Sequence, residues 1–146
     1  MKLIAAIMVL LLVGTGAFAE EPTRDFLGLG DSGKNLTDIF ALIGCLRYDS
    51  DEDGIETVTD ATIEYLIQYQ MEHGLTESGL FDPETMYFAC GIPTTEQSVD
   101  SLVWVPMFGG VKYHTTWKCS NMIEPRQMPL ECAEYLGFSK CMRCYD

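Results

Sequence analysis

The sequence has few basic residues and few histidines. Lysine and arginine together number 9 against 22 acidic residues, a formal charge of −13. Such a chain lacks the positive charge that phosphate contacts need, which excludes nucleic acid as a partner and disfavours other anionic polymers. Its only histidines, His73 and His114, are far apart in the chain. Because a zinc peptidase needs two histidines one helical turn apart, and a hydrolase triad needs suitably spaced partners, the sequence predicts no enzymatic activity.

Long hydrophobic runs are absent beyond the N-terminus. The apolar stretch 3–13 follows the single charge of Lys2 and leads to Ala17–Ala19, where small residues flank a bulky one. This arrangement is typical of a secretory signal peptide, and the stretch is too short for a comfortable membrane span. We therefore expect residues 1–19 to be a signal peptide. The mature protein would be secreted and extracellular, without a membrane segment, and would carry 8 basic against 22 acidic residues.

Turn and capping residues define the joint between two predicted helices. Gly74 supplies the open backbone conformation that ends a helix, and Gly79 turns the chain. Asp82 then offers an N-cap, and Pro83 fills the first helical position. With the helical spacing of apolar residues, these signals predict three helices, over residues 35–48, 60–73 and 83–89. The apolar residues expected on their buried faces are Leu36, Ile39, Phe40, Ile43, Leu46, Ile63, Leu66, Ile67, Met71, Met86 and Phe88.

The residues around this joint form a motif. Its members are Tyr69-Gln70, Gly74-Leu75, Ser78-Gly79, Asp82-Pro83-Glu84-Thr85 and Cys90-Gly91-Ile92-Pro93. The motif resembles that of the peptidoglycan-binding-like module, the three-helix unit also found as the prodomain of matrix metalloproteinases. The likeness covers about residues 35–94. It implies a mainly α fold there and a binding role, with a matrix or cell-wall glycan or an extracellular protein as the partner.

The remaining residues divide into a leader and a tail. Residues 20–34 are weakly patterned, and we expect a loose leader there. Residues 95–146 form a cysteine-rich tail. Alternating apolar residues over 102–107 and 111–117, on either side of a glycine pair, predict a β-hairpin, and 129–136 is expected to add a helical turn or two. The expected fold is thus a three-helix module followed by a small disulfide-rich α+β tail.

The cysteines all follow the predicted signal peptide, at Cys45, Cys90, Cys119, Cys132, Cys141 and Cys144. Export favours disulfides, but six cysteines allow 15 pairings, so the connectivity stays open. We expect Cys45 to pair with Cys90, because the first and third helices of a three-helix unit must touch, and the four tail cysteines to pair among themselves. The alternative is a zinc site that combines Cys141 and Cys144 with the two other tail cysteines.

The segment Cys90–Pro93 resembles the cysteine switch of the same prodomain, in which a thiolate blocks the open position of a catalytic zinc. In that family an arginine precedes the cysteine and an aspartate follows the proline, where this chain has Ala89 and Thr94. The switch formed by Cys90, Gly91 and Pro93 is therefore degenerate. We expect a secreted, non-catalytic binding protein. The alternative is a metalloproteinase-prodomain-like inhibitor or a truncated protease precursor, with a metalloproteinase as its partner.

An acidic segment resembles the start of a calcium loop. Asp49, Asp51 and Asp53 alternate before Gly54, and Asp60 stands where a bidentate glutamate is usual. Calcium is the one cofactor that the sequence suggests. The alternative is a solvated acidic loop between two helices, in which Asp60 is the N-cap of the second helix.

Asn35-Leu36-Thr37 is an acceptor sequence for N-glycosylation, which matters only for an exported chain. In the alternative interpretation, Asn35 caps the first helix.

Overall fold

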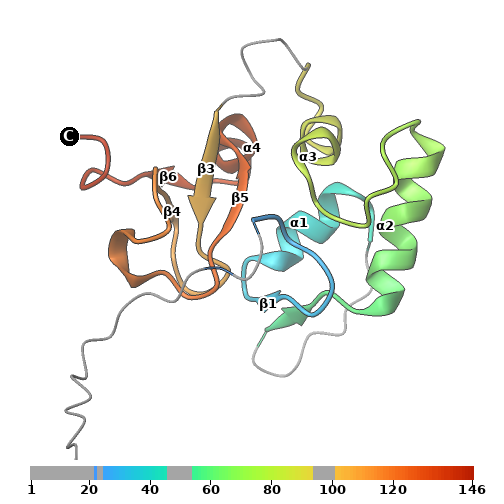
Figure 1. Ribbon diagram of the computed structural model, residues 1–146, viewed down its shortest axis with the longest axis horizontal. Helices are drawn as coiled ribbons and strands as arrows, with labels where there is room; N and C mark the ends of the chain where they lie inside the picture. Colours follow the sequence, from blue (N-terminus) through green and yellow to red (C-terminus); the bar gives the residue numbers. More distant parts are fainter. Residues whose placement is uncertain (1–21, 23–24, 46–53, 94–100) are drawn as a thin grey trace, which may run out of the picture.

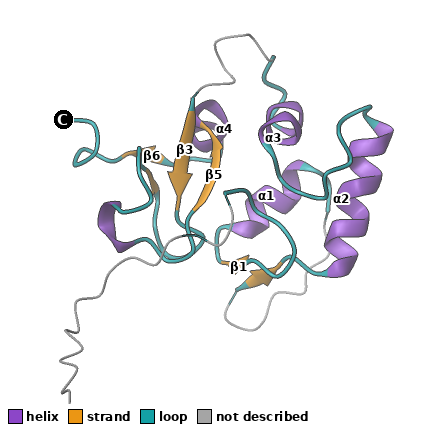
Figure 2. Cartoon of the chain, viewed as in Figure 1, coloured by secondary structure: helices purple, strands orange, loops and turns teal. Residues whose placement is uncertain are grey.

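The computed structural model describes residues 22, 25–45, 54–93 and 101–146, which form a small α+β protein (Figures 1 and 2). The described residues contain four α-helices: α1 (Leu36–Leu42), α2 (Asp60–Glu72), α3 (Pro83–Ala89) and α4 (Leu130–Tyr135). They also contain six short strands: β1 (Ser32–Gly33), β2 (Glu56–Thr57), β3 (Leu102–Val105), β4 (Lys112–Tyr113), β5 (Arg126–Pro129) and β6 (Ser139–Lys140). In Figure 1, α1, α2 and α3 lie on one side of the molecule, and β3 to β6 with α4 lie on the other.

The α2–α3 region follows its local sequence signals closely. The Asp82 side chain accepts a 2.9 Å hydrogen bond from the Thr85 backbone and so caps α3, as predicted. Gly74 and Gly79 have φ angles of 67° and 64°, which a residue with a Cβ adopts only at a cost. The cap of α2 is Thr59, which forms a capping box with Thr62, so the prediction of Asp60 in that role was wrong by one residue.

Helix α1 is shorter than the predicted helix 35–48. It ends at Leu42, and Gly44 follows with a φ of 75°. Residues 46–53, which include the candidate calcium ligands Asp49, Asp51 and Asp53, lie outside the described part of the chain. The fourth candidate, Asp60, is exposed in the first turn of α2.

The predicted hairpin is reduced to a single bridge. Strand β3 pairs antiparallel with β5 along its whole length, while β4 pairs in parallel with β6. Only Trp104 and His114 join the two predicted hairpin strands, through a pair of 2.8 Å backbone hydrogen bonds. Trp104 and both flanking valines of β3 are buried. Because both faces of β3 are covered, its side-chain pattern could not identify the strand beside it.

The hydrophobic core runs through both halves of the molecule. Its members include Leu36, Phe40, Leu66, Phe81, Met86 and Tyr87 from the helical half, and Val103, Val105, Met107, Met128 and Cys132 from the tail. Contacts between the halves are close. A Cβ added at Gly33 would lie 2.3 Å from the Met107 carbonyl oxygen, so only glycine fits there.

The expectation of a loose leader is wrong for residues 25–34. Leu27 is buried, and its carbonyl accepts a hydrogen bond from Phe81. Asp31 is buried as well and forms an ion pair with Arg126 of β5, at 3.0 Å from Nε and 2.5 Å from Nη2. The leader therefore bridges the helical half and the tail. In the part of the chain that the structure describes, no helix has the length and apolar character needed to cross a bilayer.

Candidate functional site

Gln70 is the polar centre of the α2–α3 joint. This side chain is fully buried, and its Nε2 donates to Thr85 Oγ1 at 2.8 Å, to the Leu80 carbonyl at 3.0 Å and to Ser78 Oγ at 3.2 Å. Its Oε1 accepts from the Gly79 backbone at 3.1 Å. The motif residues around Gly79 thus form one satisfied hydrogen-bond network, which fixes α3 against α2. Gln70 was not expected in the core, whereas Met71, which was, is 51% exposed.

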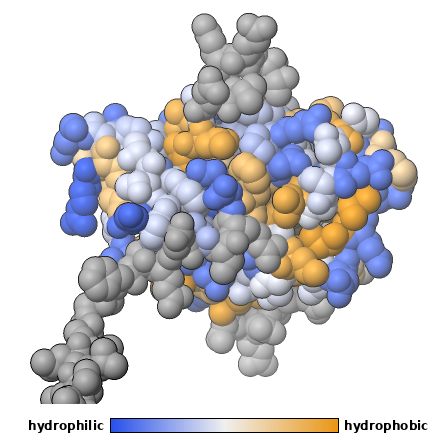
Figure 3. Space-filling model, viewed as in Figure 1, coloured by the Kyte–Doolittle hydropathy of each residue, from blue (hydrophilic) through white to orange (hydrophobic). Residues whose placement is uncertain are grey.

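An aromatic surface lies across α2 and α3 and consists of Tyr69, His73 and Phe88. The three rings contact one another, with centroid distances of 4.5 Å for Tyr69–His73, 4.7 Å for His73–Phe88 and 6.1 Å for Tyr69–Phe88. Phe88 is 45% exposed, so its predicted core role is wrong, while Met86 is buried as expected. Figure 3 shows hydrophobic surface on the side of the molecule where α2 lies. We call Tyr69, His73 and Phe88 the α2–α3 aromatic surface.

Polar groups border this surface. Gln68 Nε2 donates to Glu72 Oε1 at 2.6 Å on the exposed side of α2. Burial, and then the neighbouring Cys90 and Tyr65, raise the pKa of Tyr69. The surface therefore combines the exposed side chains of His73 and Phe88 with a half-buried Tyr69, and polar groups lie nearby on α2.

Cys90 closes α3 and is buried. A hydrogen bond with the Cys132 thiol lowers the pKa of Cys90, against the opposing effect of its burial. The same contact raises the pKa of Cys132 far above its ordinary value. No S–S bond joins any of the six cysteines. The structure places Cys90 beside Cys132, whereas Cys45 was the expected partner, because α3 packs against β5 and Tyr87 of α3 donates a hydrogen bond to Glu131 of α4.

The other three tail cysteines lie close to His114. One ligand atom from each of His114, Cys119, Cys141 and Cys144 lies within 4.8 Å of all the others. Cys119 Sγ is 3.9 Å from Cys141 Sγ, and Cys144 Sγ is 3.5 Å from His114 Nδ1. We call these residues the Cys3His cluster. The sequence-based zinc alternative had included Cys132, whose place is taken here by His114.

The parallel pairing of β4 with β6 assembles the cluster. Tyr113 pairs with Lys140, so the residues that directly follow the two strands, His114 and Cys141, lie next to each other. The backbone N–H of Cys144 donates to the Cys141 carbonyl at 3.2 Å in the turn that follows. The cysteine spacing suggested a site with Cys119, Cys141 and Cys144, but no sequence signal placed His114 beside them, because parallel strands have no short connecting turn that would indicate their pairing.

The pKa values of the cluster residues shift in both directions, and that of Cys119 is raised, first by its hydrogen bond with Cys144. Burial and then Lys112 lower the pKa of His114, which keeps the imidazole neutral. Burial raises the pKa of Cys141, but backbone N–H groups of Arg143 and Cys144 and two neighbouring thiols outweigh it, so the net shift is downward. Neutral imidazole and thiolate are the forms that bind a metal ion.

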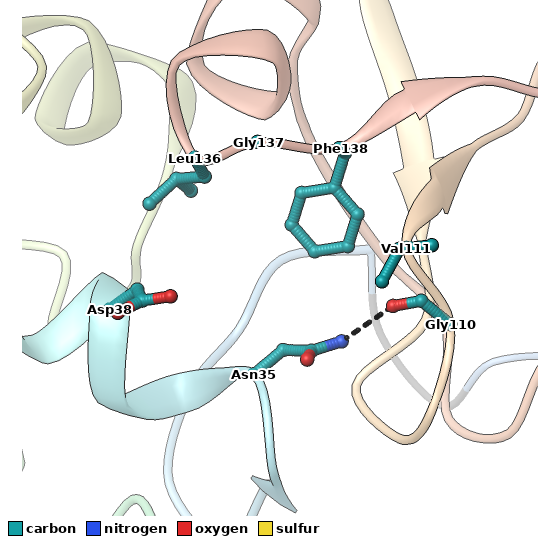
Figure 4. A pocket seen from close by; sticks show the side chains of 7 residues that line it. All are labelled: Asn35, Asp38, Gly110, Val111, Leu136, Gly137 and Phe138. Carbon is teal, nitrogen blue, oxygen red and sulfur yellow. Dashed lines mark hydrogen bonds between the residues drawn. The ribbon is translucent and has the colours of Figure 1, made fainter.

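Asn35 connects α1 to the tail. Its Nδ2 donates to the Pro106 carbonyl at 2.9 Å and to the Gly110 carbonyl at 3.1 Å, and the second bond is drawn in Figure 4. The side chain therefore makes no capping bond to α1, although Asn35 stands at its N-cap position. Nδ2 is also the atom that would carry an N-linked glycan, so a glycan would compete with these contacts. Figure 4 shows the shallow pocket beside it, of about 130 Å³, which Asp38 and Phe138 also line.

A larger hollow of about 490 Å³ lies next to His114. Phe108, Lys112 and Ile123 are among its lining residues, and Ile123 is 61% exposed. This hollow is separate in sequence from the α2–α3 aromatic surface and offers a useful comparison for binding experiments.

Three comparisons with known proteins, against family models, curated proteins and solved structures, give no match.

Proposed function

We propose that this chain is a secreted, non-catalytic binding protein whose residues 35–94 act as a peptidoglycan-binding-like module. The geometry of the joint supports the proposal, since Gln70, Gly74, Gly79 and Asp82 each have a structural role that accounts for the motif. Helices α1, α2 and α3 surround that joint in Figure 1.

The α2–α3 aromatic surface is the observation that carries the proposed binding role. Exposed aromatic rings stack on the apolar faces of sugars and anchor protein partners, and their polar edges supply hydrogen bonds. The net charge of −13 disfavours anionic polymers, so a neutral glycan is preferred to an acidic one, with an extracellular protein as the other class. Neutral N-acetylglucosamine oligosaccharides are suitable first probes, because they carry both apolar ring faces and amides.

Calorimetric titration of the full chain with these oligosaccharides tests the proposal. His73→Ala and Phe88→Ala should each weaken binding about tenfold, which corresponds to about 1.4 kcal/mol. Ile123→Ala, an exposed apolar residue in the hollow near His114, is the matched control and should leave binding unchanged. Binding that survives both aromatic substitutions would contradict the proposed surface. No binding to any neutral oligosaccharide would leave an extracellular protein as the partner class of this proposal.

The alternative, a prodomain-like protease inhibitor, needs Cys90 to reach the zinc of a metalloproteinase. Cys90 is only 9% exposed, and its thiol is engaged with Cys132. Ala89 also stands where the family has the arginine of its stabilising ion pair. These observations favour the binding role. Rapid labelling of native Cys90 by a thiol reagent, together with inhibition of a metalloproteinase, would reverse that preference.

A further inference from the structure

The Cys3His cluster has the chemistry of a zinc site. Its donors are three cysteine sulfurs and one histidine nitrogen, a set found in structural zinc sites. The Cys-x-x-Cys spacing of Cys141 and Cys144 is also typical of such sites, in which one turn supplies two ligands. All four groups come from the tail, so a metal ion would tie the C-terminal turn to the segment that follows β4.

Two of the six donor–donor distances in the cluster match a tetrahedral zinc ion, and all six are within 4.8 Å. Zn–S bonds of about 2.3 Å and a Zn–N bond of about 2.0 Å place neighbouring sulfurs about 3.8 Å apart, and sulfur and nitrogen about 3.5 Å apart. The observed separations are 3.9 Å for Cys119 Sγ to Cys141 Sγ, and 3.5 Å for Cys144 Sγ to His114 Nδ1. A disulfide would instead need its two sulfurs about 2.0 Å apart.

The number of donors also favours a metal. Three sulfurs cannot all be paired within the cluster, so a disulfide there would leave one thiol and the buried His114 without a role. A four-coordinate ion uses every donor. Cys90 and Cys132 form a separate pair.

The surroundings hold and compensate the cluster. Cys141 donates its backbone N–H to the Tyr113 carbonyl, and the Tyr145 ring packs edge-on against Tyr113 with centroids 5.7 Å apart. These contacts position the turn that carries two of the ligands. The chain has nine basic residues in all, and four of them, Lys112, Lys118, Lys140 and Arg143, lie within two residues of a ligand in sequence. Three thiolates and a zinc ion carry a net negative charge, which nearby cations stabilise.

We infer that His114, Cys119, Cys141 and Cys144 bind one structural Zn²⁺ ion in a closed tetrahedral site. Binding replaces the three thiol protons, which pass to solvent, and involves no change of oxidation state. Because all four positions are filled by protein, the ion has no open position for water or substrate, and its role is to stabilise the tail. This inference is independent of the proposed binding function.

Metal analysis of the full chain, purified without reductant or chelator, tests the inference. One zinc per chain is expected in the wild type and in two controls, His73→Gln and Cys132→Ala. His73→Gln removes the other histidine, and Cys132→Ala removes the cysteine that sequence reasoning had placed among the ligands. Zinc should be lost from His114→Gln and Cys144→Ser. Zinc loss from Cys132→Ala, or retention in both ligand variants, would overturn the assignment.

If these substitutions prevent folding, a variant that replaces one metal ligand by another still tests the inference. His114→Cys supplies a fourth thiolate and should still bind one zinc, and its cobalt form should show stronger thiolate-to-metal absorption than that of the wild type. Peptide mapping of the zinc-free protein is the second measurement. A disulfide between any two of Cys119, Cys141 and Cys144 in the purified wild type, with no zinc present, would refute the inference.

Discussion

Replacing Gln70 by methionine tests whether its hydrogen-bond network holds the α2–α3 joint together. Methionine matches glutamine in length and flexibility, so the substitution removes hydrogen bonds without leaving a large cavity. It removes all four bonds of the amide, and the bonds to Thr85 and Gly79 are buried. A buried group left without a partner costs about 1–3 kcal/mol, so the two buried partners cost about 4 kcal/mol, and added apolar burial returns about 1 kcal/mol. We expect a net loss of about 3 kcal/mol.

Thermal and urea unfolding followed by circular dichroism would measure this loss, which should lower the midpoint by about 10 °C for a domain of this size. Gln68→Met is the matched control, because Gln68 lies on the same helix with its amide exposed and should change stability by less than about 0.5 kcal/mol. The double variant with Thr85→Val should lose less than the sum of the single losses, since both changes break one shared bond. A loss below about 1 kcal/mol for Gln70→Met would refute this reasoning.

Three other substitutions test the contacts that join the two halves. Arg126→Met removes the guanidinium that pairs with the buried Asp31 carboxylate and should cost about 3–5 kcal/mol in urea unfolding, whereas an effect under about 1 kcal/mol would show that the ion pair is not formed in solution. Asn35→Asp and Thr37→Ala both remove the glycosylation triplet, but only Asn35→Asp removes the two hydrogen bonds that Nδ2 donates. In protein made without glycosylation, Asn35→Asp should lower the free energy of unfolding by about 2 kcal/mol and Thr37→Ala by less than about 0.5 kcal/mol. Equal effects would contradict the role given to Nδ2. Gly33→Ala would place a methyl group 2.3 Å from a carbonyl oxygen and should lose about 3 kcal/mol or more of unfolding free energy; a stable variant would rule out that close approach.

Sequence reasoning succeeded where local signals decide the structure. Helix α3 begins and ends as predicted, because its signals are local: Asp82 and Pro83 start the helix, and the turn at Gly91 ends it. The turn at Gly74 was also predicted correctly, because it depends on the backbone conformation of one residue. Helix α4, predicted from Pro129 onward, is present as Leu130–Tyr135.

Long-range contacts account for the expectations that failed. The burial of Gln70 could not be predicted from the residues around it on the helix, because its hydrogen-bond partners lie up to fifteen residues further along the chain. The pairing of β3 with β5 and of β4 with β6 likewise depends on tertiary packing. For the same reason the place of His114 beside three cysteines could not be read from their spacing. The expectation of disulfides stays a prediction, and for Cys119, Cys141 and Cys144 the inferred zinc site competes with it. The calcium loop also stays a prediction, because most of it lies outside the described residues.

The interlocking of the two halves has a practical consequence for dissection of this protein. A fragment cut at the ends of the motif, residues 35–94, would lose the carbonyl acceptors of Asn35 and the tail side chains that cover Leu36 and its neighbours in the shared core. Such a peptide would expose apolar surface that is buried in the intact chain, and molecules could bind to that surface non-specifically. Recombinant work on binding should therefore keep the leader and the C-terminal half attached.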